Sequence, residues 1–591
     1  MSWQASLNRT EVGHLGAAVY FYETARGDVF CVNPPLAKII TGLPVRLMSP
    51  KYDWKSYSPR PQDRAEWSLG ATFVNANTDK KIRVMLFVAR LALLPFILLG
   101  VWFGWKLAAG QYGRVSAMMF LALWMFSPLV LAWTATICPD VLAAAFGLIG
   151  FYTFLQWLKA PNLWNVGVAG FTLGLMILTK LTWIVAVPIY VVIWLLWRYI
   201  PDAGVSIEEE SICDEKRTNK KARLKELVLV FFVAVYILNM GYLFDGTFTQ
   251  LKEYKFMSEA LSSHQVDEEH TIVRLGNRFD GSGSMCETVL GYLPLPFPKD
   301  FIQGIDTQKY DFERGIESYL NGHFSHRGWK SYYIYVLLYK EPIAFLLLFL
   351  IAAGMTFFPK YRLRKEEIVI IVPLILLFVF ISFQEGISVH PRYILPCYPF
   401  AYLFISRTGL LFSKQKTSLL LRYVVVILLL WGITSSVFQY PHSMSYFNEF
   451  IRPKNGARYL QGSNVDWGQN HYYLQSWCNS HPDITLRTNY LTDSDITRLG
   501  IKNIEYLTDF RREDLSPGWY AIGVCDLYGK SEQYQVFQQF EPTEWIANTI
   551  CIYHLTQEQL DKVKEKGGHN AWRRGSVVEN FCVNGRAQVT K

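Results

Sequence analysis

The residues best suited to chemistry are carboxylates at the ends of apolar runs or close to them in the sequence. Glu11 and His14 are three residues apart, so they share one face if this segment is helical. Asp140 follows a Cys-Pro pair and begins an apolar run, where the dipole of a helix favours a carboxylate. A simple helix cap is the competing interpretation of Asp140.

Three cations lie within apolar runs or at their mouths. Arg90 is inside the first long run, Lys180 ends another, and Arg392 directly precedes Tyr393 at the start of a third. Ionisable side chains inside membrane segments cost free energy, so each one is a candidate for a functional site. For Arg90 and Lys180, the alternative is that the side chain snorkels to the lipid headgroups.

Carboxylates and cations together suit one kind of reaction at a membrane surface. Lys and Arg can hold a lipid-linked phosphate, and a carboxylate can take the proton of an attacking hydroxyl. The phosphate is then the leaving group, and the cations stabilise its developing charge. This is the electrostatic layout of a transferase that uses a lipid phosphosugar, although the pattern alone is not specific.

The elements that position these residues are long apolar helices. The chain has 591 residues, of which 51% are hydrophobic and 18% charged. About 20 apolar residues cross a bilayer as a helix, so we expect a polytopic α-helical membrane protein with about 10–13 transmembrane helices. The apolar runs are 83–105, 115–137, 140–158, 163–180, 182–198, 227–244, 342–358, 366–384, 393–410 and 419–438.

The charge distribution sets the orientation of these helices. Threading the runs through a bilayer in order places every Lys/Arg-rich connector on one face, as the positive-inside rule requires. The net charge of +9 is therefore mostly topological, and it does not indicate a nucleic-acid partner. The basic connectors are Lys106 to Arg114, Lys159, 198–225, 360–365, and Lys414 with Lys416.

The chain divides into three parts. Residues 1–82 form a first exterior loop with amphipathic segments, 83–440 the transmembrane part with a large exterior loop at 245–341, and 441–591 an exterior domain. The large loop lacks helical periodicity but is rich in aromatic residues, which argues against disorder. Because the N-terminal part lies outside without a signal peptide, we expect a further helix upstream; the alternative is that the amino tail is translocated unaided.

The C-terminal part reads as a small α/β domain. Strand-like runs at 519–524, 545–547 and 550–555 are separated by turn formers. Asp466, Trp467 and Gln469 could contact a glycan there, or they could be turn residues with the tryptophan in the core of the domain. The nine cysteines lack metal-ligand spacing, and some of those in this part, including Cys582, could pair.

Several segments, taken in their order and spacing, resemble the GT-C superfamily of membrane glycosyltransferases. The resemblance is to bacterial members related to protein O-mannosyltransferases and to the aminoarabinose transferases of lipid A. The segments are Glu11 to Leu15, Val32 to Lys38, Ser127-Pro128 with Pro139-Asp140, Gly174 to Lys180, Arg392 to Pro396, Tyr446 to Glu449 and Ser463 to Gln469.

In that family the first exterior loop carries an Asp-Glu pair whose acid is the catalytic base. Here Thr10 stands where the Asp is usual, so the resemblance shifts the base role to Glu11. Likewise Val32-Asn33 replaces a charged pair found in many relatives, whereas Asp140 and Arg392 match without departure. The predicted site has the catalytic carboxylates Glu11 and Asp140 and the substrate-binding residues His14, Asn33, Arg90, Lys180, His390, Arg392, Tyr393 and Asp466.

The resemblance implies an activity and its partners. The donor is a sugar linked to polyprenyl phosphate, the acceptor a hydroxyl on a protein, lipid or polysaccharide, and transfer inverts the anomeric carbon with a single base. The site would face the periplasm from a bacterial inner membrane. No residue is assigned to a metal, although some relatives bind a divalent cation.

Two alternatives belong to other classes of protein. A transporter or flippase would use the cations as a pathway, but the sequence shows no internal repeat. Thr10 supports the second alternative, an inactive family member that serves in binding or assembly.

Overall fold

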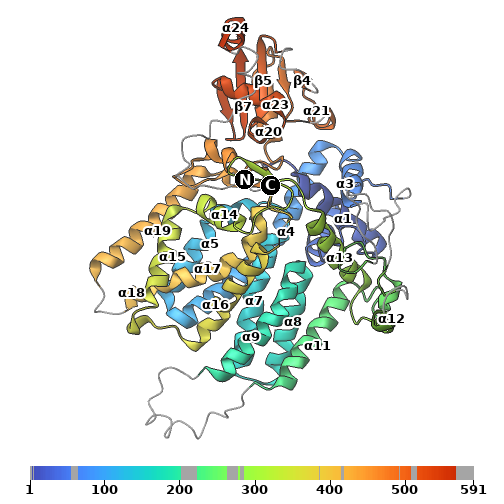
Figure 1. Cartoon of the computed structure of the whole chain (residues 1–591), viewed down its shortest axis with the longest axis vertical. Helices are drawn as coiled ribbons and strands as arrows, with labels where there is room; N and C mark the ends of the chain where they lie inside the picture. The colour runs from blue at the N-terminus through green and yellow to red at the C-terminus, as the bar shows by residue number, and fades with distance from the viewer. Residues whose placement is uncertain are drawn as a thin grey trace, which may run out of the picture.

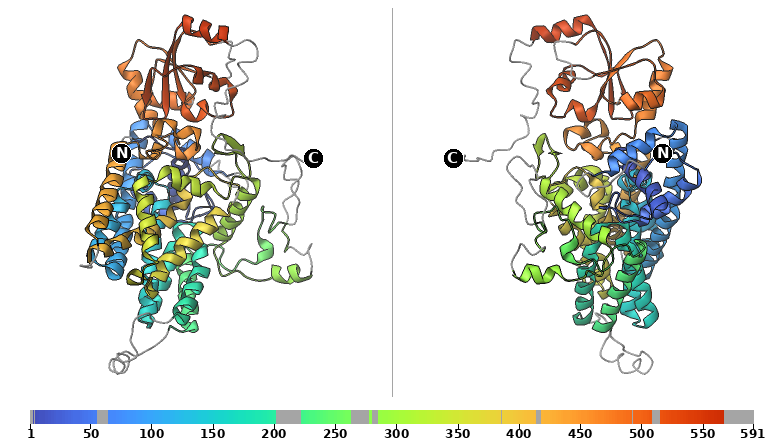
Figure 2. Two further views of the ribbon diagram at one scale, coloured as in Figure 1. Left: turned by 60° about the vertical axis from the view of Figure 1, so that its left-hand side comes forward. Right: turned by 90° about the vertical axis from the view of Figure 1, so that its right-hand side faces the viewer.

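The computed structural model of the chain describes residue 3 and residues 5–54, 64–200, 222–262, 277–279, 285–384, 386–413, 418–491, 493–507 and 515–566. Long helices form a bundle, and an α/β domain built from the C-terminal residues sits on one end of it (Figure 1). Two further views show this domain on the same end of the bundle (Figure 2). We call that end of the bundle the domain end.

Every apolar run predicted from the sequence is helical. Most follow one another up and down the bundle, so residues distant in sequence meet at its two ends. The elements are α4 (Asp79–Tyr112), α5 (Arg114–Met125), α6 (Pro128–Thr134), α7 (Asp140–Lys159), α8 (Leu163–Thr179), η2 (Leu181–Val185), α9 (Ala186–Tyr199), α11 (Leu224–Gly241), α14 (Tyr332–Lys340), α15 (Ile343–Met355), α16 (Ile368–Ser382), η6 (Pro391–Cys397), α17 (Tyr398–Ser406), η7 (Arg407–Gly409), α18 (Leu410–Ser413) and α19 (Leu419–Gln439).

Fewer of these helices than expected are long enough to span a membrane by themselves. Within the described ranges, 6 helices have the length and hydropathy for a span, or 8 if each of two bent pairs counts as one. The bends are 61° between α5 and α6 and 113° between α14 and α15. Each bend falls where proline interrupts the helix, at Pro128 and at Pro342, since proline cannot donate the helical hydrogen bond.

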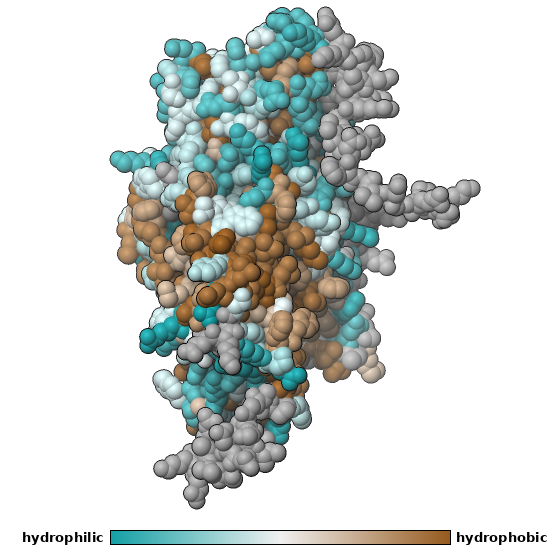
Figure 3. Space-filling model, turned by 90° about the vertical axis from the view of Figure 1, so that its left-hand side faces the viewer, coloured by the Kyte–Doolittle hydropathy of each residue, from teal (hydrophilic) through white to brown (hydrophobic). Residues whose placement is uncertain are grey.

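The surface of the bundle has the exposed hydrophobic band that a bilayer requires. A hydrophobic band crosses the visible face between the hydrophilic C-terminal domain and a hydrophilic lower end (Figure 3). On α4 and α19, large apolar side chains such as Leu98, Trp102, Leu420 and Phe438 are exposed. The chain is therefore a polytopic membrane protein, as the sequence predicts.

The end of the bundle opposite the C-terminal domain is held by an ion pair. Arg407 Nε lies 2.7 Å from Glu367 Oε1, and both side chains are buried. The Tyr112 hydroxyl donates to the same oxygen at 2.6 Å, and Lys159 approaches Glu366 at 3.7 Å. Connectors that the charge pattern assigns to one face thus meet at one end of the bundle.

The N-terminal part and the large loop hold more helix than the sequence indicates. Three helices lie side by side at the domain end: α1 (Arg9–Thr24), α2 (Leu36–Leu47) and α3 (Glu66–Asn75). The expectation of a loop without helical periodicity is wrong, because α13 (Lys299–Arg314) packs through buried Phe301 and Asp306. The other loop elements are η3 (Leu251–Glu253), α12 (Met285–Gly291), β1 (Ser318–Leu320) and β2 (His323–Ser325).

The C-terminal domain is built on a mixed sheet in the order β4-β3-β5-β7-β6. The strands β3 (Leu486–Thr488), β4 (Ile504–Tyr506) and β5 (Gly518–Gly523) are parallel, and β7 (Ile550–Leu555) runs antiparallel to β5 and to β6 (Glu544–Ile546). The sequence predicts β5, β6 and β7 but not β3 and β4, which have 3 residues each. The helices are α20 (His471–Ser480), α21 (Asp493–Leu499), α22 (Val524–Leu527), α23 (Glu532–Gln535) and α24 (Gln557–Lys566).

Cysteines do not cross-link the described part of this domain. Cys478, Cys525 and Cys551 are all free thiols there, so the pairing considered among them does not form. Cys582 lies outside the described residues.

Close contact between α4 and α7 depends on Gly100. A Cβ atom at this position would lie 2.5 Å from the Cβ and 2.6 Å from the Cα of Ala145. We therefore expect Gly100→Leu to force the helices apart. The loss in the free energy of unfolding should exceed about 1–3 kcal/mol, the usual effect of overpacking a core. Gly110 on the same helix has nothing within 4 Å of such a Cβ, so Gly110→Leu is the matched control. Thermal unfolding in detergent measures both variants, and equal melting temperatures would contradict the expectation.

Candidate active site

The domain end of the bundle collects ionisable residues from several elements. The N-terminal turn of α1 lies against α4 and against the segment between α6 and α7. Asn8 caps α1, and its side chain accepts a hydrogen bond from the backbone of Glu11 while the Glu11 carboxylate accepts one from the Asn8 backbone. This capping box explains why a helix begins here, and it fixes Glu11 at the start of the helix.

Glu11 forms a buried ion pair with Arg90 of α4. The guanidinium donates from Nε to Oε1 at 2.9 Å and from Nη2 to Oε2 at 2.6 Å. The backbone N–H of Ile137 also donates to Oε1, at 3.0 Å. With the Asn8 backbone, four donors surround a carboxylate that is fully buried. Arg90 is thus held inside the protein, and the snorkelling interpretation does not describe it.

Asp140 is the second buried carboxylate of the site. It begins α7, and its Oδ1 accepts a hydrogen bond from Lys180 Nζ at 2.5 Å. Arg392 Nε lies 3.5 Å from Asp140 Oδ2. Lys180 comes from the end of α8 and Arg392 from η6, so three apolar segments bring these charges together. We call Glu11, Arg90, Asp140, Lys180 and Arg392 the charged cluster.

Thr10 connects the charged cluster to the C-terminal part of the chain. Its hydroxyl oxygen accepts a hydrogen bond from Arg392 Nη1 at 3.0 Å and another from Trp467 Nε1 at 2.8 Å. The position where the related family usually has its acid therefore points at the cluster, although threonine has no charge there. Trp467 lies at the junction with the bundle, so it does not fill the core of the small domain.

Aromatic and histidine side chains surround the cations. The Tyr393 ring lies under Lys180 Nζ at 4.7 Å, and Arg392 stacks over Trp133 at 5.0 Å. His390 hydrogen-bonds Ser463 Oγ at 2.8 Å, and its ring contacts Trp467 at a centroid distance of 5.1 Å. Trp133 was not among the predicted residues, because an aromatic side chain in an apolar run has no distinguishing pattern.

His14 lies on the same face of α1 as Glu11, as its spacing predicts. The ring is buried and packs on Phe30 with 4.5 Å between centroids. Burial lowers the pKa of His14 well below its usual value, and the positive charges of Arg392 and Lys38 lower it further. The imidazole is therefore neutral near pH 7.

Two predicted residues lie apart from the charged cluster. Asn33 is half-buried near the start of α2, and its described hydrogen bond is made by its backbone, to Phe30. Asp466 faces the C-terminal domain, where it accepts hydrogen bonds from the Tyr490 hydroxyl at 2.7 Å and from the Gly468 backbone at 2.8 Å. The bond to Gly468 is the turn geometry considered for Asp466, and the bond to Tyr490 links it to the sheet.

The side chains of the site do not suit a divalent cation. Among the residues that the structure describes, no group of three His, Cys, Asp or Glu is arranged to hold a metal ion. Both carboxylates of the charged cluster are already paired with cations. We therefore derive no catalytic step that uses a metal.

The fold and the charged cluster define a class of protein: a polytopic membrane protein with a buried, net positive site under a C-terminal α/β domain. Residues 74–202 match the family model of dolichyl-phosphate-mannose-protein mannosyltransferase. This segment contains Arg90, Asp140 and Lys180. The match confirms, for this part of the chain, the resemblance to membrane glycosyltransferases.

Solved structures are similar to this chain over most of its length. The structure of ArnT from Cupriavidus metallidurans bound to undecaprenyl phosphate matches 94% of this chain and 96% of its own, with 11% identity and a TM-score of 0.41. The Archaeoglobus fulgidus oligosaccharyltransferase matches 91% of this chain and 69% of its own, with 8% identity and a TM-score of 0.39. No curated protein sequence matches the chain.

Proposed function

We propose that the chain is an inverting glycosyltransferase that moves a sugar from a polyprenyl-phosphate donor to an acceptor hydroxyl on the non-cytoplasmic face of the membrane. The charge of the cluster carries this proposal. Arg90, Lys180 and Arg392 are three cations against the two carboxylates Glu11 and Asp140, which leaves one positive charge in excess in a buried site. A buried excess positive charge favours an anion such as a lipid phosphate.

The cations divide into two groups by their partners. Arg90 donates hydrogen bonds to both Glu11 carboxylate oxygens and to the backbone oxygens of residues 5 and 6, so it holds the fold together. Lys180 and Arg392 share the single carboxylate of Asp140. We therefore assign the phosphate to Lys180 and Arg392, which would stabilise the negative charge that grows on the leaving group.

The geometry favours Asp140 over Glu11 as the base. A carboxylate has about four lone-pair sites, and Glu11 already accepts four hydrogen bonds. Asp140 Oδ2 has Arg392 Nε at 3.5 Å, longer than a hydrogen bond, so a lone pair is left for a proton. Glu11 is then a positioning residue that joins α1, α4 and the start of α7.

The proposed step is a single displacement. The acceptor oxygen attacks the anomeric carbon from the face opposite the phosphate, and a new C–O bond forms as the old one breaks. The phosphate leaves with the electron pair toward Lys180 and Arg392, and the acceptor proton goes to Asp140. One displacement inverts the configuration and needs one base.

Transfer from a labelled undecaprenyl-phosphate sugar, in vesicles that contain the purified chain, tests the proposal. The expected result is label in a glycosidic bond with inverted configuration. Label that crosses the vesicle membrane on intact lipid, without cleavage of the glycosidic bond, would instead establish a flippase.

Thr10 gives one specific reason to consider an inactive binding protein. It occupies the position of the related family's acid and is held by Arg392 and Trp467. An inactive protein of this kind would bind undecaprenyl phosphate but transfer no sugar. The proposal predicts both binding and transfer.

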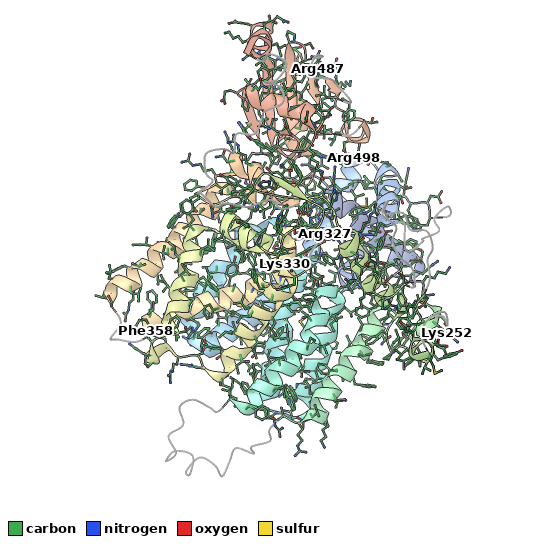
Figure 4. The ribbon with its side chains drawn as sticks, in the orientation of Figure 1. Lys252, Arg327, Lys330, Phe358, Arg487 and Arg498 are labelled. Atoms are coloured by element: carbon green, nitrogen blue, oxygen red, sulfur yellow. The ribbon has the colours of Figure 1, made fainter. Side chains whose placement is uncertain are left out.

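Loss of the Arg392 charge is expected to weaken binding of the lipid phosphate. A hydrogen bond to a charged group contributes about 1.5–3 kcal/mol, so Arg392→Gln should raise the Kd for undecaprenyl phosphate at least about tenfold. Titration of the purified protein in detergent measures this. Arg327→Gln is the matched control, because Arg327 is an exposed cation outside the cluster (Figure 4). Equal affinities for the two variants would contradict the assignment.

A further inference from the structure

A cavity separate from the charged cluster lies between the N-terminal helices and the C-terminal sheet. Its volume is about 550 Å³, a size that holds a small organic ligand. Arg9 and Val12 line it from the start of α1 and Leu7 from just before that helix, and Ala71 and Asn75 line it from α3. The opposite wall comes from the C-terminal domain, including Asp466, Trp467, Tyr490, Arg498 and Asp526. Figure 4 shows Arg498 at this junction between the domain and the bundle.

The cavity lies where the topology of the sheet opens a crevice. Strand β3 is flanked by the parallel strands β4 and β5, and the chain leaves β3 toward β4 before it returns to β5 on the other side. Outside the carboxyl ends of such strands, at the point where the connections diverge, α/β domains commonly bind ligands. Asn489 and Tyr490 follow β3, Tyr506 ends β4, and Asp526 follows β5, and all of them line the cavity.

Several polar groups of this wall have unused hydrogen-bonding capacity. Within the described residues, the buried Asn489 Oδ1 has no hydrogen-bond partner, and the buried His471 Nδ1 has none either, because the nearest carboxylate oxygen, Asp495 Oδ1, lies 3.8 Å away. Buried polar atoms are almost always satisfied, so two orphaned atoms at one cavity indicate groups that a ligand would satisfy. Asp526 is half-buried, and partial removal from water raises its pKa to about 6.

The net charge of the residues that line the cavity is unfavourable for a phosphate, the group proposed to bind at the charged cluster. Arg9 and Arg498 oppose three carboxylates, Asp466, Asp495 and Asp526, so the acidic groups exceed the basic ones by one. A phosphate or nucleotide would be repelled here, unlike at the charged cluster.

Aromatic side chains supply the remaining recognition surface. They are Trp467, Tyr490, Tyr506 and Tyr534. A sugar ring presents apolar C–H faces and a rim of hydroxyls, so aromatic rings beside carboxylate and amide oxygens match both of its surfaces.

We propose that this cavity binds a short stretch of carbohydrate, and that this carbohydrate belongs to the acceptor. The statement that this carbohydrate belongs to the acceptor rests on the proposed function. It implies that the acceptor carries a glycan, whereas the sequence leaves protein, lipid and polysaccharide acceptors open.

One helix joins the cavity to the charged cluster. On α1, Arg9 and Val12 face the cavity while Thr10 and Glu11 face the cluster. Trp467 lines the cavity and also donates its hydrogen bond to Thr10. A glycan held in the cavity would need to extend past Trp467 by about the 10–12 Å thickness of a helix to place its terminal hydroxyl at Asp140.

Calorimetric titration of the full chain with four disaccharides tests the cavity directly. The probes are maltose, cellobiose, chitobiose and mannobiose, in a detergent without a sugar headgroup. We expect saturable binding of at least one probe. Ala71→Trp should weaken it at least tenfold, because Ala71 is exposed on α3 at the cavity and an indole there fills the space without removing a partner. Thr72→Trp, on the next, exposed position outside the cavity lining, should leave it unchanged.

The outcomes separate this inference from the proposed function. Binding of no probe, or equal binding by Ala71→Trp and Thr72→Trp, would overturn the cavity as a carbohydrate site even if the chain transfers sugar to a peptide or lipid. Binding that Ala71→Trp abolishes, in a chain that transfers no sugar, would support the cavity and overturn its role for an acceptor. Loss of both binding and transfer to a glycan in Ala71→Trp, but not in Thr72→Trp, would support the whole inference.

Discussion

Replacement of Asp140 by asparagine is expected to slow sugar transfer by roughly 10²–10⁴-fold, the usual contribution of a general base. The amide keeps the shape of the side chain and its contact with Lys180, whose Nζ lies 2.5 Å from Asp140 Oδ1. It cannot accept the proton of the acceptor hydroxyl. Initial rates of transfer from an undecaprenyl-phosphate sugar, at saturating donor, measure the effect.

Donor binding by the same variant distinguishes a lost base from a damaged site. Because Asp140→Asn removes a negative charge beside Lys180 and Arg392, the cluster becomes more positive. The affinity for undecaprenyl phosphate should therefore stay the same or rise. Slow transfer together with weakened lipid binding would show instead that Asp140 mainly holds the two cations in place. Transfer at the unmodified rate would remove Asp140 from the mechanism.

Breaking the ion pair between Glu11 and Arg90 is expected to cost about 3–5 kcal/mol, because one buried charge loses its partner. Arg90 is 2% exposed and Glu11 0%, so water cannot replace the missing group. Arg90→Met and Glu11→Gln should each lower the melting temperature in detergent, and the double variant should lose less than the two single losses combined. Thermal unfolding of the four proteins gives the coupling between the residues.

A surface pair on the neighbouring helices provides the control. Glu23 of α1 and Arg46 of α2 are 2.7 Å apart, but the Arg46 side chain is 48% exposed. Such pairs contribute about 0–1 kcal/mol, so Glu23→Gln and Arg46→Gln should change the melting temperature little. If the effects of Arg90→Met and Glu11→Gln were additive, or as small as those of the surface pair, the structural role of Glu11 would be wrong.

The sequence predicts the positions of the membrane helices well, because each apolar run is long and its basic connectors fall on one face. It also identifies the cations of the charged cluster, since ionisable side chains within apolar runs or at their ends stand out. Arg90, Lys180 and Arg392 are each found by this signal and all three lie in the cluster.

The partners and the burial of each ionisable side chain cannot be predicted from the sequence in the same way. Nothing near Glu11 in the sequence shows that Arg90 and the backbone of Ile137 fill its acceptor sites. From the packing of α1 we therefore propose Asp140, rather than Glu11, as the base. The sequence pattern does not reveal strands β3 and β4, so the crevice between them and β5 could not be predicted either.

A structure of the chain with undecaprenyl phosphate tests the central claim most directly. We predict that phosphate oxygens lie within about 3 Å of Lys180 Nζ or of the Arg392 guanidinium, the distance of a charge-assisted hydrogen bond. A lipid phosphate bound at the opposite end of the bundle, or at the domain end but away from both cations, would contradict the account.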